Sequence, residues 1–373
     1  MRYYVIAGER SGDLHGGNLL RALRKNDPQA IFKGFGGDQM EAAGCEITLH
    51  YKNMAFMGFW EVLKNLGKVK RYLKLCRKDA LEFKPDVAIL IDFAGFNLRM
   101  AKFLKENNIR TCYYISPKIW AWGQGRAKKI KKYVDQMLVI LPFEKEFYKK
   151  YDWDVDYVGN PVCDAVQAHT TNTKFLTSHG LKEDEQPVAL LPGSRTQEIR
   201  KITPLFKEVA ARFPRYRFML AAVRSVPVSA YDGLGDVNNI ELVFEETYDL
   251  LAHARAAIVA SGTATLETAL WKTPQLVVYK TSYVSYMIAR MLIKVPYISL
   301  VNLVLDRPLV KELIQGEMTV GAVSEELQKL MRDGERRREV TEGHEELARL
   351  LGDGNASEQA AERTIEGLSK KTD

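Results

Sequence analysis

The sequence predicts an α/β protein of two doubly wound domains that face each other across a cleft. Short apolar runs rich in β-branched residues alternate with stretches of helical periodicity, which is typical of parallel sheets with crossover helices. The alternation stops in the polar segment 167–186 and then restarts, and 373 residues are enough for two hydrophobic cores. A single large α/β domain would also fit this alternation. In either arrangement, ligands are expected beyond the carboxyl ends of the strands.

The first half of the chain contains six expected strands with helices between them. Helical spacing of apolar residues marks helices such as 14–25 and 98–107. The strands are expected at residues 3–7, 31–34, 87–91, 111–115, 137–141 and 157–158. We expect residues 1–168 to form the N-terminal domain.

The second half repeats the pattern and ends in a charged helical region that starts near residue 325. Strands are expected at residues 188–191, 217–221, 240–243, 256–260 and 275–279. We expect residues 169–345 to form the C-terminal domain. Residues 346–373 are expected to form a helical tail that packs back on the N-terminal domain or on a partner subunit.

Composition and charge narrow the class of protein. Residues 1–165 carry 28 Lys and Arg against 19 Asp and Glu, and the remainder carries 26 against 28, so the net charge of +7 is concentrated in the first half. A basic half suits an anionic membrane surface or a nucleic acid. The four cysteines form no CxxC pair, which argues against a zinc site or a disulfide framework. With no secretory signal and no apolar run of about 18 residues, the chain is expected to be cytoplasmic.

The first strand-to-helix turn carries small and polar residues. Gly8 and Gly12 let the backbone approach a ligand closely, and Ser11 or Asp13 can cap the following helix. A tight turn with an N-cap would account for these residues too, but it does not require Glu9 beside them. The segment lacks the spacing of a dinucleotide-binding GxGxxG loop.

Asp92 directly follows the wholly apolar strand expected at 87–91, so its carboxylate is predicted at the rim of the sheet. Partial desolvation there raises the pKa of a carboxylate and suits it to act as a general base. An N-cap for the next helix is the structural alternative.

Residues 54–78 combine an apolar segment with a basic helix. Apolar residues from Val62 to Cys76 recur at helical spacing, and lysines and arginines occupy the other faces. Such a helix behind an apolar loop suits docking on acyl chains and anionic headgroups, although a core-facing helix with a solvated basic face has the same pattern. The residues expected at a membrane are Phe56, Met57, Phe59, Trp60, Lys64, Lys68 and Arg71.

Two segments in the second half indicate a nucleotide-diphosphate site. Each follows an apolar strand and leads into a helix, where free backbone N–H groups and the helix dipole favour anions. Arg195 offers a planar fork for phosphate oxygens, and Glu267 is placed to accept hydrogen bonds from ribose hydroxyls. Alone, each segment is also an ordinary strand-to-helix turn. The residues are Gly193, Ser194 and Arg195 in the first segment and Ser261, Gly262, Thr263, Ala264 and Glu267 in the second.

The sequence offers no Asp-x-Asp motif in a loop suited to a metal-bound diphosphate. The nearest match, at Asp152 and Asp154, is expected in an exposed loop. We therefore expect no metal and no cofactor, with Arg195 and helix dipoles neutralising the diphosphate.

At these residues the sequence resembles the lipid-A-disaccharide synthase family of GT-B glycosyltransferases. The likeness covers most of the chain and runs through many segments in one order. These segments are Gly8-Glu9-x-Ser11-Gly12-Asp13, Met57-Gly58-x-x-Glu61-Val62, Ile91-Asp92, Phe96-Asn97, Ser116-Pro117-x-Ile119-Trp120-Ala121-Trp122, Leu141-Pro142-Phe143-Glu144, Leu191-Pro192-Gly193-Ser194-Arg195, Ser261-Gly262-Thr263-Ala264 with Glu267, Asn302-Leu303 and Leu309-Val310-Lys311-Glu312-Leu313-Ile314-Gln315.

The resemblance implies a GT-B fold and an inverting transfer. UDP-2,3-diacylglucosamine would donate its sugar to 2,3-diacylglucosamine 1-phosphate, giving a β(1→6)-linked disaccharide 1-phosphate and UDP. The first domain would take the acylated acceptor from the anionic inner-membrane surface, with which the protein would associate peripherally, and the second would bind the UDP-sugar. Nucleic acid is not an implied partner, and a homodimer stays open.

The resemblance also implies roles for single residues. Asp92 is expected to take the proton from the acceptor 6-hydroxyl, with Glu9 as the second candidate for the base. Arg195 and the segment from Ser261 are expected to hold the departing diphosphate, and Glu267 the ribose. The residues expected to complete the substrate sites are Ser11, Gly12, Asn97, Asn302 and Gln315.

One loop departs from the family pattern. Many members carry Asp-x-Pro-Asp-Phe-Asn where this chain has Asp92-Phe93-Ala94-Gly95-Phe96-Asn97. The later acid is missing and cannot be an essential base here, which favours Asp92. Because Ala94 replaces a proline, the rigidity of the loop is left open.

Other functions fit parts of the sequence. A different UDP-sugar GT-B enzyme, such as a peptidoglycan-precursor transferase or an epimerase, would share the diphosphate site. A two-domain solute-binding protein would share the architecture. The aromatic and lysine-rich segment 113–132 would suit base stacking on a nucleic acid, a membrane interface, or a buried Trp pair beside a solvated helix.

Overall fold

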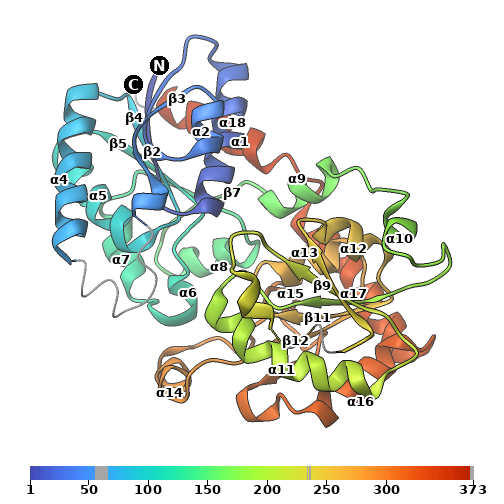
Figure 1. The fold of residues 1–373 in the computed structure, drawn as a ribbon. Helices are drawn as coiled ribbons and strands as arrows, with labels where there is room; N and C mark the ends of the chain where they lie inside the picture. Colours follow the sequence, from blue (N-terminus) through green and yellow to red (C-terminus); the bar gives the residue numbers. More distant parts are fainter. Residues whose placement is uncertain (55–65, 233, 235–236, 370–373) are drawn as a thin grey trace. The chain divides into compact units, whose positions relative to one another are not determined.

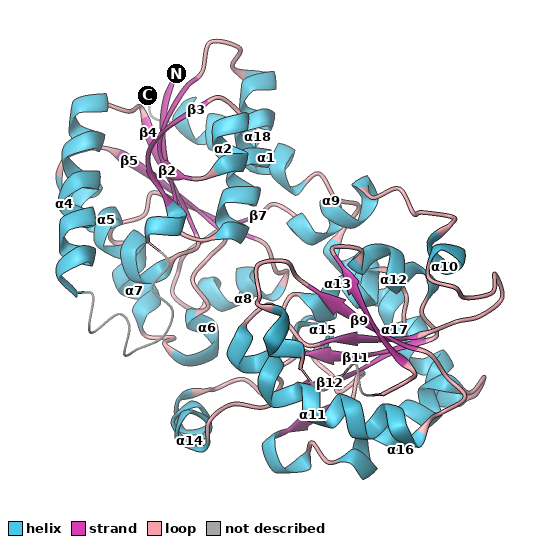
Figure 2. Ribbon diagram, in the orientation of Figure 1, coloured by secondary structure: helices cyan, strands magenta, loops and turns pink. Residues whose placement is uncertain are grey.

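The computed structural model describes residues 1–54, 66–232, 234 and 237–369, which form two compact units (Figures 1 and 2). Unit 1 contains Met1–Pro161 and the C-terminal residues from Gly354, and unit 2 contains Val162–Asp353. These limits differ from the expected ones at 168 and 345. The difference arises because α17 (Glu335–Leu351) packs on helices of unit 2, so the chain returns to unit 1 only at Gly354.

Unit 1 is built on a parallel sheet of seven strands in the order β3-β2-β1-β4-β5-β6-β7. Six of the strands overlap the expected ones. The strand that was not expected, β3, lies at the edge and is mostly half-exposed, so its mixed sequence carries little apolar signal. The strands are β1 (Arg2–Ala7), β2 (Ile31–Gly36), β3 (Cys45–His50), β4 (Val87–Ile91), β5 (Arg110–Tyr114), β6 (Gln136–Val139) and β7 (Asp156–Tyr157).

Helices cover both faces of this sheet, and alternate residues of β1 serve the two layers. Tyr3, Val5 and Ala7 pack into the core that includes residues of α1 and α18. Tyr4 points to the other face, where its hydroxyl donates to Asp79 of α4 at 2.8 Å. The helices are α1 (Arg10–Asn26), α2 (Asp38–Ala42), α4 (Leu66–Phe83), α5 (Ala94–Glu106), α6 (Ile119–Trp122), α7 (Arg126–Lys131), α8 (Phe143–Lys149) and α18 (Ala356–Ser369).

The C-terminal helix α18 is part of the core of unit 1 rather than an appendage. It packs against α1, and Ala360 and Ala361 are fully buried there. At its surface Lys25 forms an ion pair with Glu358 at 2.6 Å.

Unit 2 has a parallel six-stranded sheet in the order β10-β9-β8-β11-β12-β13. The expected bounds of β8, β11 and β12 match the structure, because these strands are continuous apolar runs buried on both faces. The short strand β13 was not expected. The strands are β8 (Val188–Leu191), β9 (Phe218–Ala222), β10 (Ile240–Phe244), β11 (Ala256–Ala260), β12 (Gln275–Tyr279) and β13 (Glu312–Ile314).

Helices also cover both faces of the second sheet. Residues of α10 and α12 share a core with alternate residues of β8, β9 and β11, while α16 packs on β11 and β12. The helices are α9 (Pro161–Ala168), which starts at the boundary, α10 (Phe175–Ser178), α11 (Thr196–Arg212), α12 (Thr247–His253), α13 (Ala264–Leu270), α14 (Tyr283–Leu292), α15 (Leu300–Leu305), α16 (Val320–Met331) and α17.

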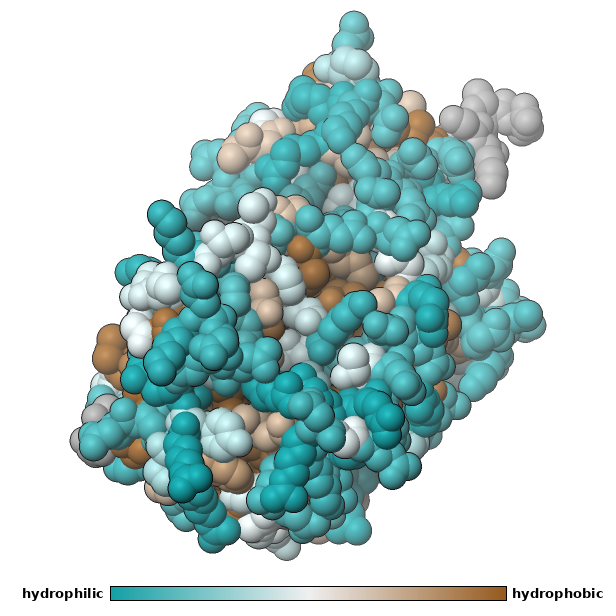
Figure 3. Space-filling model, turned by 90° about the vertical axis from the view of Figure 1, so that its right-hand side faces the viewer, coloured by the Kyte–Doolittle hydropathy of each residue, from teal (hydrophilic) through white to brown (hydrophobic). Residues whose placement is uncertain are grey.

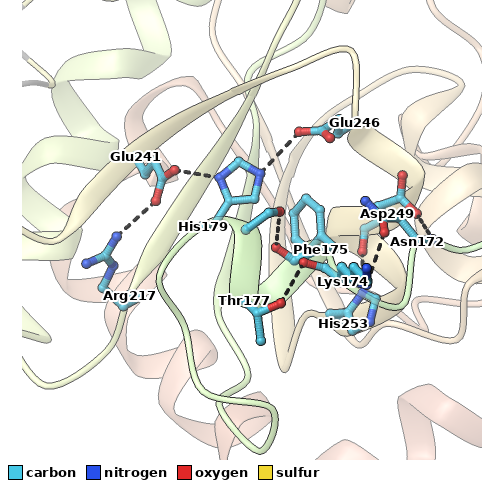
Figure 4. Close-up of polar contacts among 11 residues, drawn as sticks. Asn172, Lys174, Phe175, Thr177, His179, Arg217, Glu241, Glu246, Asp249 and His253 are labelled. Carbon is cyan, nitrogen blue, oxygen red and sulfur yellow. Dashed lines mark hydrogen bonds and ion pairs between the residues drawn. The ribbon is translucent and has the colours of Figure 1, made fainter.

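The polar segment 167–186, at which the alternation of strands and helices stops, is anchored to unit 2. Phe175 is fully buried in the core. The ring of His179 lies between Glu241, at 2.6 Å, and Glu246, at 3.1 Å, and Arg217 pairs with the same Glu241 (Figure 4). Buried apolar area and ion pairs therefore fix a stretch that polar composition alone marks as mobile.

Each sheet reverses its strand order between two neighbouring strands, β1 and β4 in unit 1 and β8 and β11 in unit 2. The loops that leave the carboxyl ends of such a pair diverge to opposite faces, which opens a crevice where doubly wound proteins bind ligands. Gly8 and Asp92 follow β1 and β4, and the segments from Pro192 and Ser261 follow β8 and β11. All predicted catalytic and diphosphate-binding segments thus lie at the two switch points.

None of the helices in the described part of the chain is both long enough and apolar enough to cross a bilayer. On the face drawn in Figure 3, hydrophilic residues dominate and hydrophobic ones form small groups between them.

Candidate functional site

The switch point of unit 1 is a strained turn that carries Asp92. Both Asp92 and Phe93 adopt left-handed backbone angles, with φ of 42° and 45°. Left-handed φ is unfavourable for residues with a side chain, and two in succession persist only where the surroundings hold them. Phe93 is the N-cap of α5 without a side-chain hydrogen bond, so Asp92 is not the N-cap that the structural alternative predicted.

Gly8 packs against the same strained turn. A Cβ atom at Gly8 would lie 2.2 Å from Cδ1 of Phe93, so no larger residue fits while the ring stays in place. The ring of Phe93 in turn stacks on Phe96 at 5.6 Å between centroids. The glycine therefore lets the loops after β1 and β4 pack directly on each other.

Asn97 supports the turn from below. It is fully buried, and its Nδ2 donates to the backbone oxygens of Ile91, at 3.1 Å, and Asp92, at 2.9 Å. The hydroxyl of Tyr113 donates to the same Asp92 oxygen. Asn97 therefore stabilises the backbone that carries Asp92, and its expected contact with substrate stays a prediction.

The environment of Asp92 suits a proton acceptor. Burial raises the pKa of its carboxyl group, and the negative charge of Glu9 raises it further. The cation of Lys118 and the N–H of Phe93 act in the opposite direction. Asp92, Glu9 and Lys118 thus interact electrostatically at one rim of the sheet, and Lys118 is a site residue that the sequence motifs did not reveal.

The segment that carries Lys118 is held by a buried carboxylate. Glu144 accepts hydrogen bonds from Ser116 Oγ at 2.8 Å and from Trp120 Nε1 at 3.1 Å, and also from the N–H groups of Ile140 and Leu141. Burial raises the pKa of the Glu144 carboxyl, while these donors lower it. The Ser-Pro and Leu-Pro-Phe-Glu motifs therefore form one internal network that fixes the loop around residue 118.

The turn after β1 is less capped than its sequence suggests. Helix α1 begins at Arg10, its N-cap Glu9 makes no side-chain capping bond, and Ser11 is exposed in the first turn. Gly12 is buried against Ala7 of β1. Asp13 caps α2 instead, accepting from the N–H of Gly37 at 2.7 Å. Glu9, Arg10 and Ser11 are the exposed residues of this turn.

The switch point of unit 2 is an open, cationic turn. Gly193 has a φ of +91°, a conformation that favours glycine. Arg195, the N-cap of α11, leaves 64% of its side chain exposed and pairs with Glu198 at 3.3 Å. Ser194 beside it is also exposed. A guanidinium with this exposure has donors free to reach an incoming anion.

The second segment of this switch point presents its small residues to solvent. Gly262 and Thr263 are exposed, and Ala264 starts α13. The hydroxyl of Ser261 donates to the backbone oxygen of Ile298 at 2.8 Å, and Thr265 bonds back to Gly262. The Ser261 hydroxyl thus fixes the loop, whereas Gly262 and Thr263 are exposed to solvent.

Glu267 lies one turn further along α13, where Tyr248 donates to its carboxylate at 3.2 Å. Burial raises the pKa of Glu267, and the tyrosine hydrogen bond lowers it. The carboxylate has acceptor capacity for further hydroxyl groups beyond that one bond.

Asn302 and Gln315 bond to other loops of unit 2. Asn302 is buried, its Nδ2 donates to Glu312 and to the oxygen of Val310, and its Oδ1 accepts from the N–H of Val310. Gln315 accepts from the N–H of Thr281 at 2.9 Å and donates back to its oxygen. Both side chains thus bond to neighbouring loops of unit 2, and their expected contact with substrate stays a prediction.

The expected membrane residues divide into two groups. Phe56, Met57, Phe59, Trp60 and Lys64 lie outside the described residues. Lys68 and Arg71 are exposed on α4. The apolar stripe of this helix faces the core, with Leu73 and Cys76 buried, so α4 follows the pattern of a core-facing helix with a solvated basic face.

Within the described part of the chain, no three His, Cys, Asp or Glu side chains are grouped as metal ligands. The residues that sequence reasoning missed are Lys118, Glu198 and Tyr248. Lys118 acts on Asp92 and Tyr248 on Glu267, and in both pairs the partners come from different elements. Glu198 pairs with Arg195, and only this pair has a spacing that the sequence could have revealed.

A family model described as lipid-A-disaccharide synthetase matches residues 3–365. The lipid-A-disaccharide synthase of Myxococcus xanthus (strain DK1622) is 41% identical over 375 residues, with 98% of this chain and 97% of that protein covered. The enzyme of the same name from Syntrophus aciditrophicus (strain SB) is 39% identical, with 99% and 98% covered.

Solved structures with the same fold include nucleotide-sugar enzymes. A UDP-GlcNAc 2-epimerase from Neisseria meningitidis, bound to UDP-GlcNAc, superposes with a TM-score of 0.69 at 14% identity over the full length of both chains. A calicheamicin glycosyltransferase gives a TM-score of 0.63 at 14% identity, covering 100% of this chain and 98% of that one. The two Rossmann-like units thus have the GT-B fold.

Proposed function

The chain belongs to the lipid-A-disaccharide synthase family, and from this membership we propose how its two switch points share the reaction. It is a glycosyltransferase that makes the lipid A disaccharide. The observation that carries the proposal is the contrast between a desolvated carboxylate at one switch point and an exposed guanidinium at the other. Proton abstraction requires the first, and a departing diphosphate requires the second.

Asp92 is the general base of the proposed reaction. Its carboxylate takes the proton of the acceptor 6-hydroxyl, and that oxygen attacks the anomeric carbon of UDP-2,3-diacylglucosamine. The new carbon–oxygen bond forms as the bond to the diphosphate breaks, so the configuration inverts and UDP leaves with the electron pair. Burial supports this role because it raises the proton affinity of Asp92, while the cation of Lys118 favours the charged carboxylate that accepts the proton.

Unit 2 binds the donor in this proposal. Arg195 leaves Glu198 and pairs with the diphosphate, with the backbone N–H groups of Ser194 and of the Gly262 turn as further donors. Glu267 accepts hydrogen bonds from the ribose hydroxyls. Asn302 and Gln315 act as positioning residues that hold the loops around this site.

The remaining residues of unit 1 are assigned to the acceptor. Glu9 and Ser11 are exposed in the turn after β1 and orient the acceptor sugar, with Glu9 as the second candidate for the base. Gly12 provides the close packing of α1 on β1, and Asn97 holds the strained turn.

We propose that the reaction needs neither metal nor cofactor, because Arg195 and the surrounding N–H groups supply the positive potential for the diphosphate.

The acylated glucosamine substrates lead us to propose a cytoplasmic protein that associates peripherally with an anionic inner membrane. Exposed Lys68 and Arg71 on α4 support such contact, and nucleic acid is not a proposed partner. A homodimer remains part of the proposal to be tested by light scattering.

The experiment is to incubate the protein with the two diacylated sugars and to follow disaccharide 1-phosphate and UDP together. We expect equal amounts of both products, and unchanged turnover after treatment with EDTA. Release of UDP without disaccharide, or 2-epimerisation of UDP-GlcNAc, would overturn the assignment. Loss of activity with EDTA that returns on adding a divalent cation would overturn only the metal-free mechanism.

A further inference from the structure

Unit 2 carries an apolar helix that does not pack as helices of globular proteins do. Among the described residues, six of the fifteen exposed large hydrophobic side chains lie between residues 283 and 293. They include Tyr283, 74% exposed, and Met291, 81% exposed, and the others are Met287, Ile288, Leu292 and Ile293. Globular proteins rarely expose so many large apolar residues within one short segment, and such a patch marks an interaction surface.

These residues occupy one side of α14. With 3.6 residues per turn, Tyr283, Met287, Ile288, Met291 and Leu292 fall within about half of the helix circumference. Tyr286 and Ala289, on the opposite half, are partly buried. The apolar side of this helix therefore faces away from the protein body, whereas an amphipathic surface helix usually turns its apolar side toward the core.

The charge around this helix is of one sign. Residues 280–305 contain no Asp or Glu, and they contain three cations, Lys280, Arg290 and Lys294. Arg290 and Lys294 are both exposed. An apolar face bordered by lysine and arginine is complementary to a bilayer with anionic headgroups, where rings and aliphatic chains enter the acyl region and cations stay among phosphates.

The helix is mounted on the loops of the proposed donor site. It follows β12, which ends at the same edge of the sheet as β8 and β11 (Figure 1). Its entry is pinned by Gln315, which exchanges two hydrogen bonds with Thr281. Its exit is pinned at Ile298, whose oxygen accepts from Ser261 and whose N–H donates to Glu312. The segment that carries α14 is thus bonded to Ser261 at its exit and to Gln315, which follows β13, at its entry.

We propose that α14 is a membrane-docking helix of unit 2, which lies on an anionic phospholipid surface and brings the donor site to it. Its 10 residues span about 15 Å, half of the hydrocarbon core, so the helix lies along the interface and does not cross it. The proposal rests on the proposed function, in which the UDP-sugar carries acyl chains that start in that membrane. It adds a second contact to the one proposed for unit 1.

The test uses the full chain and two double variants. Ile288→Ser/Met291→Ser removes apolar contact, and Arg290→Ser/Lys294→Ser removes charge. Leu350→Ser is the matched control, because Leu350 is 46% exposed on α17, far along the chain from α14. Binding is measured by co-sedimentation with vesicles of phosphatidylethanolamine and phosphatidylglycerol, and with vesicles of phosphatidylcholine alone. Turnover is measured in parallel on detergent-dispersed substrates.

We expect the apolar variant to bind both kinds of vesicle at least about tenfold more weakly. The charge variant is expected to lose about tenfold or more only on the anionic vesicles. The control binds as the wild type does, and all three variants keep their turnover in detergent. That detergent assay separates this proposal from the proposed function. Absence of transferase activity in the wild type in detergent would contradict the proposed function, and it would not bear on membrane docking.

Unchanged vesicle binding in both double variants would overturn the proposal, as would a wild-type protein that binds neither kind of vesicle. A smaller oligomer in light scattering for the apolar variant would also overturn it, since α14 would then be an interface between copies of this chain.

Discussion

At the switch point of unit 1 a carboxylate is withdrawn from water, whereas at that of unit 2 a guanidinium is exposed to it. The two sheets share the strand order that creates both crevices. The turn at Asp92 contains two left-handed residues, and it is held by the buried amide of Asn97 and by the close packing of Phe93 on Gly8. Around Arg195 the residue with positive φ is Gly193, and glycine adopts this conformation without strain. The same topology thus provides the location, and the local residues decide the chemistry.

The difference also concerns preorganisation. A general base has to meet one hydroxyl at hydrogen-bond distance, so its backbone is fixed before substrate arrives. A diphosphate offers many oxygens, and a mobile side chain that exchanges Glu198 for phosphate is sufficient.

The largest effect is expected from Asp92→Asn, which keeps the shape of the side chain and removes the proton acceptor. Turnover should fall by about 10³-fold, within the range of a lost general base. Glu9→Gln, at the neighbouring carboxylate, should reduce turnover by less than about tenfold. Steady-state rates of disaccharide formation check both, and a reversed order of the two losses would move the base to Glu9.

The acid limb of the pH–rate profile gives a second view of Asp92. Because burial raises its pKa above the ordinary 3.8, the base becomes protonated, and kcat/KM falls, at a pH higher than that of a solvent-exposed aspartate. Glu9→Gln removes a charge that raises this pKa, so the limb should move to lower pH. A limb that does not move would show that the titrating group is not Asp92.

Arg195→Ala is expected to weaken UDP binding by about 10–100-fold, the scale of a lost charge-assisted hydrogen bond. Glu198→Gln is the matched variant, since it frees Arg195 from its ion pair and should leave UDP affinity unchanged or slightly tighter. Calorimetric titration with UDP checks both. If Arg195→Ala bound UDP as tightly as the wild type, the cationic switch point would not be the diphosphate site.

The smallest effect is expected from His179→Gln, which lies in unit 2 but away from its switch point. Burial alone would lower the pKa of His179, but its hydrogen bonds to Glu241 and Glu246 outweigh this and raise it above 6.5. The folded state therefore binds the proton more tightly than the unfolded state does. The stabilisation is complete below pH 6.5 and is lost as the pH rises through the folded-state pKa.

The substitution should lower the free energy of unfolding by about 1 kcal/mol below pH 6.5 and by less at alkaline pH. Denaturant unfolding at both pH values measures this, and UDP affinity should stay unchanged. An equal loss at both pH values would mean that packing against Phe175, and not the proton, stabilises the segment.

The central strands at both switch points were easier to predict than the strands at the edges of the two sheets. The strands β4, β8 and β11 were predicted to the residue, because each is a continuous apolar run that ends at a polar or small residue. The edge strands β3 and β13 escaped prediction, since half-exposed strands of mixed composition carry little apolar signal.

Individual side chains were harder to place. Asp92 could be predicted because it follows such a strand directly, and Arg195 because it lies in the turn that connects such a strand to the next helix. The contacts that hold Asp92 come from Gly8 and Tyr113, which the fold brings together from distant parts of the sequence. Gln315 likewise bonds to Thr281, 34 residues away. No local pattern shows that such a polar residue turns inward to a backbone and not outward to a ligand.

The most direct test of the division of labour is to titrate UDP into the Asp92→Asn protein and the wild type under the same conditions. If the carboxylate serves only the acceptor, the two dissociation constants should agree within about twofold, although turnover differs by about 10³-fold. A dissociation constant for Asp92→Asn that rises tenfold or more would contradict the account, because the two switch points would then not divide base and leaving group between them.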